Sequence, residues 1–301
     1  MGKSAITVIS VPFGMGAGRP GSEMGPDHIL KFGLVKKLHQ LGYEVSYDKR
    51  ILLPEHIEIA ANISSPMKHE AEAIAISSVL AREVADTVRQ GGTPLILGGD
   101  HSISMGTLSG LTQHYRELGV IWFDAHSDLN TEATSPSGNM HGISLAVALG
   151  LAGIKPQEIA SGAVPIKPEH CVIIGARDLD RGEKAFIRSC GITCFTMHEI
   201  DRLGIEHVVN EALRIAGDGT DGIHLSFDID SVDPIEAPGT GTPVRGGVSY
   251  REAHLALELM NESGVITSAD FVEVNPSLDH NNQTSKLVVD LIGSLFGSRI
   301  L

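Results

Sequence analysis

The chain has 301 residues, with 37 acidic and 23 basic side chains that give a formal net charge of −14. Hydrophobic residues make up 42% of it and aromatic residues 4%, which is too apolar for a disordered chain and too interrupted for a membrane protein. The acidic balance and the few aromatic rings argue against a nucleic-acid partner. The apolar runs fall short of the roughly 20 residues that cross a bilayer. Composition therefore predicts a soluble globular protein that binds neither nucleic acid nor membrane.

The cysteines and the start of the chain indicate a compartment. Cys171, Cys190 and Cys194 lie in or beside apolar segments, and their odd number predicts reduced thiols rather than a disulfide framework. Met1–Ser4 lead directly into a short apolar run without the long apolar region of a secretory signal. We therefore expect a cytoplasmic protein.

Short apolar runs alternate with longer stretches of helical period along the whole chain. Two runs, Val120–Phe123 and Val172–Ile174, are too continuously apolar for a sheet with one face in water, which indicates parallel strands covered on both sides. The predicted strands are Ile6–Ser10, Glu44–Tyr47, Leu95–Leu97, Val120–Phe123, Val172–Ile174, Ile192–Phe195, Ile223–Phe227 and Thr267–Val274.

Helical patterns fill the stretches between these runs. The clearest helix is predicted for residues 69–90, where apolar side chains recur every four residues, and another for residues 249–263, where Ser249 and Glu252 form a capping-box pattern. No fixed-period repeat or Pro/Ser-rich linker divides the sequence, so we expect one domain over residues 1–301. The alternation predicts a three-layer α/β/α fold around a mostly parallel sheet of about eight strands.

Three polar clusters directly follow apolar runs, at the strand ends where open parallel sheets bind ligands. They are Gly98-Gly99-Asp100-His101-Ser102, Asp124-Ala125-His126-Ser127-Asp128 and Asp228-Ile229-Asp230. If the strand direction persists past Phe123, the spacing of Asp124, His126 and Asp128 places all three side chains on one face. The Gly98-Gly99 pair lacks the Lys-Ser/Thr of a phosphate loop, and we expect it to let the backbone turn sharply beneath His101.

These clusters bring four aspartates and two histidines together as candidate metal ligands: His101, Asp124, His126, Asp128, Asp228 and Asp230. Like charges at such short range repel, so without cations some carboxylates would be protonated. Two divalent cations balance the four negative charges, and carboxylate with imidazole suits Mn²⁺ first and Zn²⁺, Co²⁺ or Fe²⁺ to a lesser degree. A single aspartate after a strand is more often a turn or cap residue, but capping does not require the same ligand types at three strand ends. The pattern therefore predicts a two-metal site that activates water.

The three blocks, the last of them extended to Ser226–Pro234, resemble the signature motifs of the ureohydrolases, the arginase and agmatinase family. Their order and separation match nearly the whole chain, from Pro12 to the end. The resemblance implies two Mn²⁺ ions per subunit. It places His101 and Asp128 on one ion, His126 and Asp230 on the other, and Asp124 and Asp228 between them. It also implies that His141 transfers a proton and that Glu273 binds the guanidinium group of the substrate.

The segment after the second block resembles the arginase pattern, since agmatinases lack its Ser-Gly-Asn stretch before His141. The resemblance implies α-carboxylate donors at Asn130, Ser137 and Asn139, α-ammonium acceptors at Asp180 and Glu183, and Thr242 beside the guanidinium pocket. Neutral amide and hydroxyl donors suit a carboxylate because they do not compete for the guanidinium. A helix N-terminus is the alternative interpretation of Asp180 and Glu183.

The sequence departs from the family pattern at Ser127, at Ser231-Val232, at Ile143-Ser144 and in the Gly16–Gly21 loop. None of these positions is a predicted ligand or substrate contact. The chain ends at Leu301 without the tail that links mammalian arginase trimers, which is typical of the bacterial type. We therefore expect a homo-oligomer, a hexamer or a trimer.

The predicted reaction is cleavage of L-arginine to L-ornithine and urea by attack of a metal-bridging hydroxide on the guanidinium carbon. Glu273 would position that carbon, and Asp128 and His141 would carry a proton to the leaving amine. Two alternatives remain. One is an agmatinase-like or other guanidino-compound hydrolase. The other is a non-catalytic, metal-stabilised oligomer, against which His141 and Glu273 speak because a structural metal site needs neither.

Overall fold

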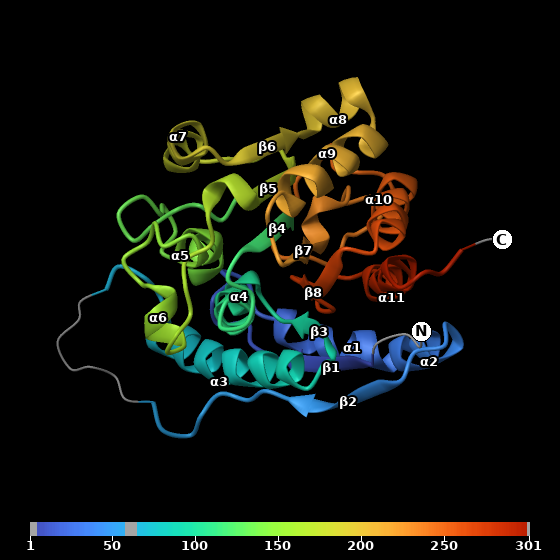
Figure 1. Ribbon diagram of the computed structural model, residues 1–301, viewed down its shortest axis with the longest axis horizontal. Coiled ribbons are helices and arrows are strands. Elements are labelled where there is room, and N and C mark those ends of the chain that lie inside the picture. The colour runs from blue at the N-terminus through green and yellow to red at the C-terminus, as the bar shows by residue number, and fades with distance from the viewer. Residues whose placement is uncertain (1–4, 58–64, 300–301) are drawn as a thin grey trace.

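The computed structural model describes residues 5–57 and 65–299 (Figure 1). The residues Met1–Ser4 and Leu301, used above, lie outside this described part. The strands are β1 Ile6–Val11, β2 Val45–Arg50, β3 Thr93–Gly98, β4 Leu118–Phe123, β5 Cys171–Ala176, β6 Thr193–Thr196, β7 Gly222–Asp228 and β8 Ile266–Val272. The helices are α1 Gly25–Lys31, α2 Leu34–Gln40, α3 Glu70–Arg89, α4 Ser104–Leu111, α5 Ser144–Ala148, α6 Pro156–Ile159, α7 Arg181–Cys190, α8 Met197–Leu203, α9 Ile205–Gly217, α10 Tyr250–Ser263 and α11 Gln283–Leu295. Short 3₁₀ turns include η2 His101–Ile103, η3 Met140–Ile143 and η5 Ile229–Ser231.

The strands form one eight-stranded sheet in the order β2-β1-β3-β8-β7-β4-β5-β6. Neighbouring strands pair in parallel throughout. The mostly parallel sheet and the approximate positions of all eight strands are therefore confirmed. The largest difference in bounds is at β2, which continues to Arg50.

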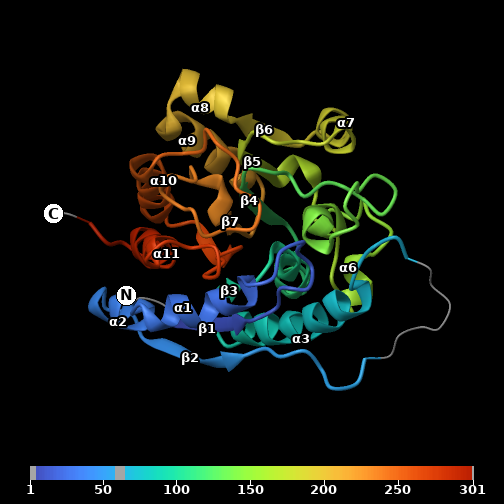
Figure 2. The same ribbon diagram turned by 180° about the vertical axis from the view of Figure 1, so that it is seen from behind.

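Helices cover both faces of the sheet, as Figures 1 and 2 show from opposite sides. Alternate strand residues point to opposite faces, so each strand contributes to two separate apolar clusters. In β4, Ile121 and Phe123 join the cluster beneath α9, α10 and α11, whereas Val120 and Trp122 join the one beneath α3, α4 and α5. These two clusters separate three layers, which confirms the expected α/β/α fold.

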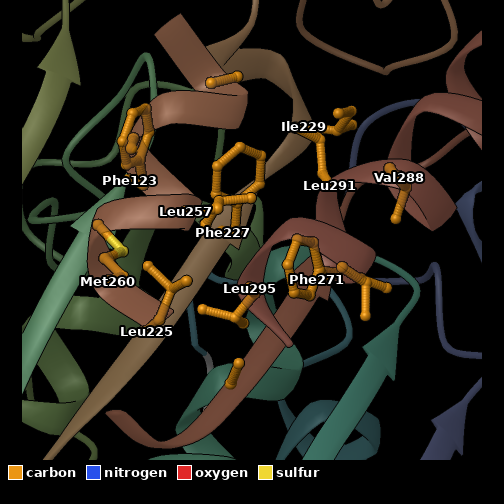
Figure 3. Close-up of a cluster of buried hydrophobic side chains, with 14 of the residues drawn as sticks. Phe123, Leu225, Phe227, Ile229, Leu257, Met260, Phe271, Val288, Leu291 and Leu295 are labelled. Atoms are coloured by element: carbon orange, nitrogen blue, oxygen red, sulfur yellow. The ribbon is translucent and has the colours of Figure 1, made fainter. Parts of the chain in front are cut away.

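Three phenylalanines from neighbouring strands hold the centre of one apolar layer (Figure 3). Phe227 in β7 stacks on Phe123 of β4 at 5.1 Å between ring centroids and on Phe271 of β8 at 5.3 Å. All three are fully buried. The row ties together the central strands whose ends carry the polar clusters.

Two helices match their predictions closely. The predicted helix 69–90 is α3, with Ile76, Leu80 and Val84 buried against the sheet. The predicted helix 249–263 is α10, and Ser249 with Glu252 forms the expected capping box.

The three cysteines are unpaired, as predicted, although only Cys171 is fully buried. Within the described residues, no helix has both the length and the apolarity needed to span a bilayer.

The sheet order decides where the polar clusters meet. The strands β3, β8, β7 and β4 are consecutive neighbours, and all are parallel, so their carboxyl ends lie at one edge of the sheet. His101 follows β3, Glu273 follows β8, Asp228 ends β7 and Asp124 follows β4. Segments far apart in sequence are thereby brought to one place.

Candidate functional site

The same local turn follows three of these four strands. In each, an aspartate side chain accepts a hydrogen bond from the backbone N–H two residues later: Asp100 from Ser102 at 2.9 Å, Asp124 from His126 at 2.7 Å, and Asp228 from Asp230 at 2.7 Å. This Asx turn stops the strand and redirects the chain. Asp124 and Asp228 therefore shape the turns and are also candidate ligands. Asp100 shapes its turn with Oδ1 and accepts the N–H of Gly16 at 2.8 Å with Oδ2.

The strand direction does not persist past Phe123 into the cluster Asp124-Ala125-His126-Ser127-Asp128, as the prediction for this cluster required. The extended conformation stops at Phe123, and Asp128 has a φ of +50°, so strand alternation does not place Asp124, His126 and Asp128 on one face. Their side chains come together because the backbone turns after β4. The spacing of Asp124, His126 and Asp128 therefore correctly predicts that their side chains cluster, but the predicted cause, a continued strand, is wrong.

The chain bends at Gly99 and Asp100, as the Gly98-Gly99 pair predicts, and the position of Gly99 shows a further reason for glycine. Its φ is not positive, but a Cβ at this position would collide with the carbonyl oxygen of Phe13. That carbonyl accepts the N–H of Asp100 at 2.8 Å, and Gly99 N donates to Val11 at 2.9 Å. The lack of a side chain at Gly99 therefore permits two backbones to approach closely beside this bend.

His101 lies at the centre of the buried carboxylates. Its Nδ1 atom is 3.1 Å from one oxygen each of Asp124, Asp128 and Asp228. The imidazole stacks on Trp122 with 4.1 Å between ring centroids and 3° between planes. His101, Asp124 and Asp228 form one group of side chains close enough to share a metal ion.

A second such group adjoins the first. His126 Nδ1 lies 3.2 Å from Asp230 Oδ2 and 3.4 Å from Asp124 Oδ1, and these three residues could hold a second ion. Asp124 belongs to both groups, because its other oxygen, Oδ2, is the one near His101. Among the ion pairs of the described residues, Asp228 is paired with His101 and not with His126. All six predicted ligands thus lie together at one edge of the sheet.

Titration of the site reflects this crowding of charge. Burial and the carboxylates of Asp230 and Asp124 raise the pKa of Asp228 well above its usual range. Burial lowers the affinity of His126 for a proton, yet Asp230 and Asp124 outweigh it and raise the pKa of this imidazole well above its usual range. Without metal, protons must therefore neutralise a cluster that is too negative to be stable by itself.

The hydrogen bonds around His101 show whether its Nδ1 atom could bind a cation. Ser226 Oγ donates to Asp270 Oδ1 at 2.6 Å, so toward His101 Nε2, 2.8 Å away, it can only accept. Nε2 therefore carries a proton, and in the neutral imidazole Nδ1 presents a lone pair to three carboxylate oxygens. Nδ1 is buried without a hydrogen-bond partner among the described residues. A lone pair facing carboxylates fits a cation between them.

Glu273 and His141 form a pair beside the cluster. Glu273 Oε1 accepts the N–H of His101 at 2.9 Å and lies 3.0 Å from His141 Nδ1. Burial opposes protonation of His141, but the hydrogen bond and charge of Glu273 raise the pKa of His141 to about 9. The structure thus brings Glu273 and His141, two of the three predicted catalytic side chains, beside the metal groups.

Two adjoining cavities open over the site, of about 240 and 440 Å³. Asn130, Ser137, Asp180 and Glu183 line the first, Glu273 lines the second, and Asn139 and Thr242 line both. Thr242 Oγ1 donates to Asp230 Oδ2 at 2.9 Å. All the predicted substrate contacts therefore face these connected cavities.

Glu183 has a structural task that matches the helix N-terminus interpretation. Its carboxylate accepts from Asp180 N at 2.7 Å, from Ser127 Oγ at 2.8 Å and from Leu129 N at 3.3 Å, and it forms the capping box of α7 with Asp180. Asn130 Nδ2 donates to Asp180 Oδ2 at 2.8 Å. Ser127, a departure from the family pattern, thus anchors the second block to α7.

Sequence reasoning missed the polar side chains behind the metal groups. Ser226 and His224 alternate in β7, and Ser268 and Asp270 alternate in β8, all of them fully or almost fully buried. His224 lies 2.9 Å from Ser268 Oγ and 3.3 Å from Asp270 Oδ2. A signal for these residues was present in the sequence. Buried parallel strands are usually apolar throughout, so polar residues at every second position of β7 and β8 indicate a buried polar network.

Sequence reasoning assigned no role to Arg177, which directly follows β5. Its guanidinium donates to the carbonyls of Asp230 at 2.6 Å, Ser231 at 3.1 Å and Val244 at 2.8 Å. It therefore fixes the third block against the loop that carries Thr242.

Comparison with known proteins gives a consistent result. Residues 4–297 match the description "Arginase family". An arginase from Bacillus subtilis is 48% identical and one from Bacillus caldovelox 46% identical, each over 296 residues that cover 98% of this chain and 99% of the relative. The solved structure of the Bacillus caldovelox arginase superposes with a TM-score of 0.94 at 46% identity, covering 99% of this chain and 100% of that one.

Proposed function

The chain belongs to the arginase family, and on this premise we propose that it is a hydrolase that cleaves the guanidinium group of L-arginine to L-ornithine and urea. One observation carries the proposal from the chain's own residues. His101 Nδ1 faces oxygens of Asp124, Asp128 and Asp228 at 3.1 Å, with Glu273 and His141 beside them. This combines a cation site with groups that a purely structural metal site does not need.

We propose two divalent cations, Mn²⁺ by preference, as cofactors. His101 and Asp128 would hold one and His126 and Asp230 the other. The two oxygens of Asp124 already face the two histidines, which supports its shared position; that of Asp228 follows from the family resemblance. When bound, such cations act as Lewis acids and lower the pKa of water toward neutrality.

Glu273 would orient the substrate. Its carboxylate is almost completely buried, and a guanidinium is the planar donor that a carboxylate binds best. Binding there fixes the direction of the guanidinium carbon relative to the metal groups. Displacement of the hydrogen bond to His141 would release that imidazole for proton transfer.

His141 and Asp128 would move the proton. The leaving nitrogen of L-ornithine must be protonated before the carbon–nitrogen bond breaks, and a positioned imidazole or carboxylate can deliver that proton. Both residues line the first cavity.

The amino-acid end of L-arginine would lie at the outer part of the cavities. Asn130, Ser137 and Asn139 offer neutral donors to the α-carboxylate, and Asp180 offers an acceptor to the α-ammonium. Glu183 is occupied by three donors, so its contact with substrate stays a prediction of the resemblance.

Urea release tests the proposal. We expect turnover of L-arginine after manganese loading, loss of turnover after chelation, and far slower turnover of agmatine, which lacks the α-carboxylate. Preference for agmatine would indicate a different guanidino-compound hydrolase, and absence of urea from both would contradict the proposed reaction.

We further propose a single domain over residues 1–301 that works in the cytoplasm as a homo-oligomer. The continuous eight-stranded sheet supports the first point. Light scattering of the metal-loaded protein tests whether it forms a hexamer or a trimer.

A further inference from the structure

The segment that precedes α3 is fastened to the loop that carries Ser137 and Asn139. Lys68 N donates to the carbonyl of Gly138 at 2.7 Å, and Lys68 Nζ donates to Asn139 Oδ1 at 3.2 Å. In Figures 1 and 2 this segment enters α3 beside the loops around α5 and α6. One residue therefore holds the predicted carboxylate-binding loop by its backbone and by its side chain.

The backbone position of Lys68 is fixed from both sides. Met67 is buried in the apolar layer, with 5% of its surface exposed. Gly138 has a φ of +69°, and a Cβ there would lie 2.7 Å from the carbonyl oxygen of Pro66. The two segments therefore pack so closely that only glycine fits at position 138.

The lysine contact decides which way the Asn139 amide faces. Because Oδ1 accepts from Lys68, the NH₂ group is the part of the amide left for the cavities that Asn139 lines. An NH₂ group can donate to a carboxylate, whereas the amide oxygen would repel it. Lys68 thus holds Asn139 as a donor.

The charge of Lys68 also favours binding of a carboxylate. The first cavity is lined by the acidic residues Asp128, Asp178, Asp180, Glu183 and Asp228, which would repel the α-carboxylate of an amino acid. Lys68 places a positive charge against Asn139, which lines both cavities, and its exposed side chain forms no ion pair within the described residues.

We propose that Lys68 is a specificity-determining residue, which holds the Asn139 amide in its donor orientation and supplies the positive charge that selects guanidino compounds bearing a carboxylate. This inference rests on the proposed function and adds a residue outside the motifs. Lys68 does not touch the reacting atoms, so it acts on binding of the amino-acid end and not on the chemical step.

The test compares Lys68→Met with the unchanged enzyme, both loaded with manganese. We expect KM for L-arginine to rise about ten-fold while kcat stays within about two-fold, because a charge-assisted contact remote from the reaction is lost. Agmatine, measured as a substrate or a competitive inhibitor, should bind as before. Lys68→Arg should restore most of the affinity for L-arginine. In a double-mutant cycle, Lys68→Met and Asn139→Ala together should weaken L-arginine binding by less than the sum of their separate effects.

Lys155→Met is the matched control, since Lys155 Nζ also donates to nearby loop carbonyls, those of Gly150 and Ala152, but does not face the site. Lys155→Met should leave the KM for L-arginine and the binding of agmatine unchanged. An unchanged KM for L-arginine in Lys68→Met, or equal losses for L-arginine and agmatine, would overturn the inference. Failure of the unchanged enzyme to release urea from L-arginine would instead contradict the proposed function.

Discussion

Two predicted catalytic residues have backbones in the left-handed region. Glu273 has a φ of +64° and Asp128 a φ of +50°, conformations that cost a non-glycine residue roughly 1–3 kcal/mol. Glu273 N donates to Gly99 at 2.7 Å, and this hydrogen bond holds the strained turn after β8. Such strain persists where the surrounding structure requires it, and here it aims the carboxylates of both residues into the site.

The first prediction concerns the charge of Glu273. Glu273→Gln keeps the size and the acceptor for His101 N but removes the negative charge that would bind a guanidinium, so we expect kcat/KM for L-arginine to fall by at least about 100-fold. Manganese content should stay unchanged, because Glu273 is not a predicted ligand. Glu262→Gln, on the exposed side of α10, is the control and should retain full activity. Retention of activity in Glu273→Gln would show that another group binds the guanidinium.

A second prediction at this scale concerns Ser226. Ser226→Ala removes the acceptor that fixes the protonation of His101 Nε2, so we expect manganese affinity to fall by about 10–100-fold. Metal content after dialysis, measured by atomic emission, reports this directly. Ser268→Ala changes an equally buried serine on the neighbouring strand that contacts His224 instead, and it should lose much less metal. Equal losses in the two variants would show that general disturbance of the sheet, not support of His101, is the cause.

At the scale of elements, the strands and their polar ends were predictable because apolar runs followed by Asp-His or Asp-x-Asp are local features. The strand order was not, since adjacency of β3, β8, β7 and β4 depends on packing between segments up to about 170 residues apart, as the His101–Glu273 contact shows. Glu273 lies at the end of the predicted strand Thr267–Val274, like the other polar clusters, but only the family resemblance gave it a role in the site. The turn after β4 was also missed, because an Asx turn and a continued strand begin with the same residues.

The third prediction tests the packing of β1 against the end of β3. A Cβ at Gly99 would collide with the Phe13 carbonyl, and backbone cannot move aside as a flexible side chain can. Gly99→Ala should therefore displace the turn that carries His101, lower the midpoint of thermal unfolding and reduce metal content together. Gly217→Ala is the control at the end of α9, where a Cβ would make an ordinary contact 3.6 Å from Ile223. It should leave stability and metal content nearly unchanged. A Gly99→Ala protein with normal metal content would show that the backbones can separate at little cost.

At the scale of the whole molecule, the site concentrates negative charge in a protein that already carries a net charge of −14. Without metal, the folded state binds protons at Asp228, His126 and His141 more tightly than the unfolded state does, because their folded pKa values are raised. For each of them, the stabilising effect is present below the unfolded pKa and is lost as pH rises toward the folded pKa. The lowered pKa of Asp124 has the opposite effect, but only in the acid range below its usual value.

The metal-free protein should therefore lose stability between pH 6 and pH 9, and bound manganese should remove that loss by taking the place of the protons. We expect the difference in thermal midpoint between manganese-loaded and chelated protein to widen by at least about 5 °C over this interval, as measured by differential scanning calorimetry. Asp228→Asn removes one of the crowded charges and should flatten the curve of the chelated protein. Asp201→Asn, an exposed carboxylate on α8, should leave it unchanged. A difference that stays constant or narrows with rising pH would mean that protons do not replace the cations in this cluster, and the electrostatic account of the site would have to be abandoned.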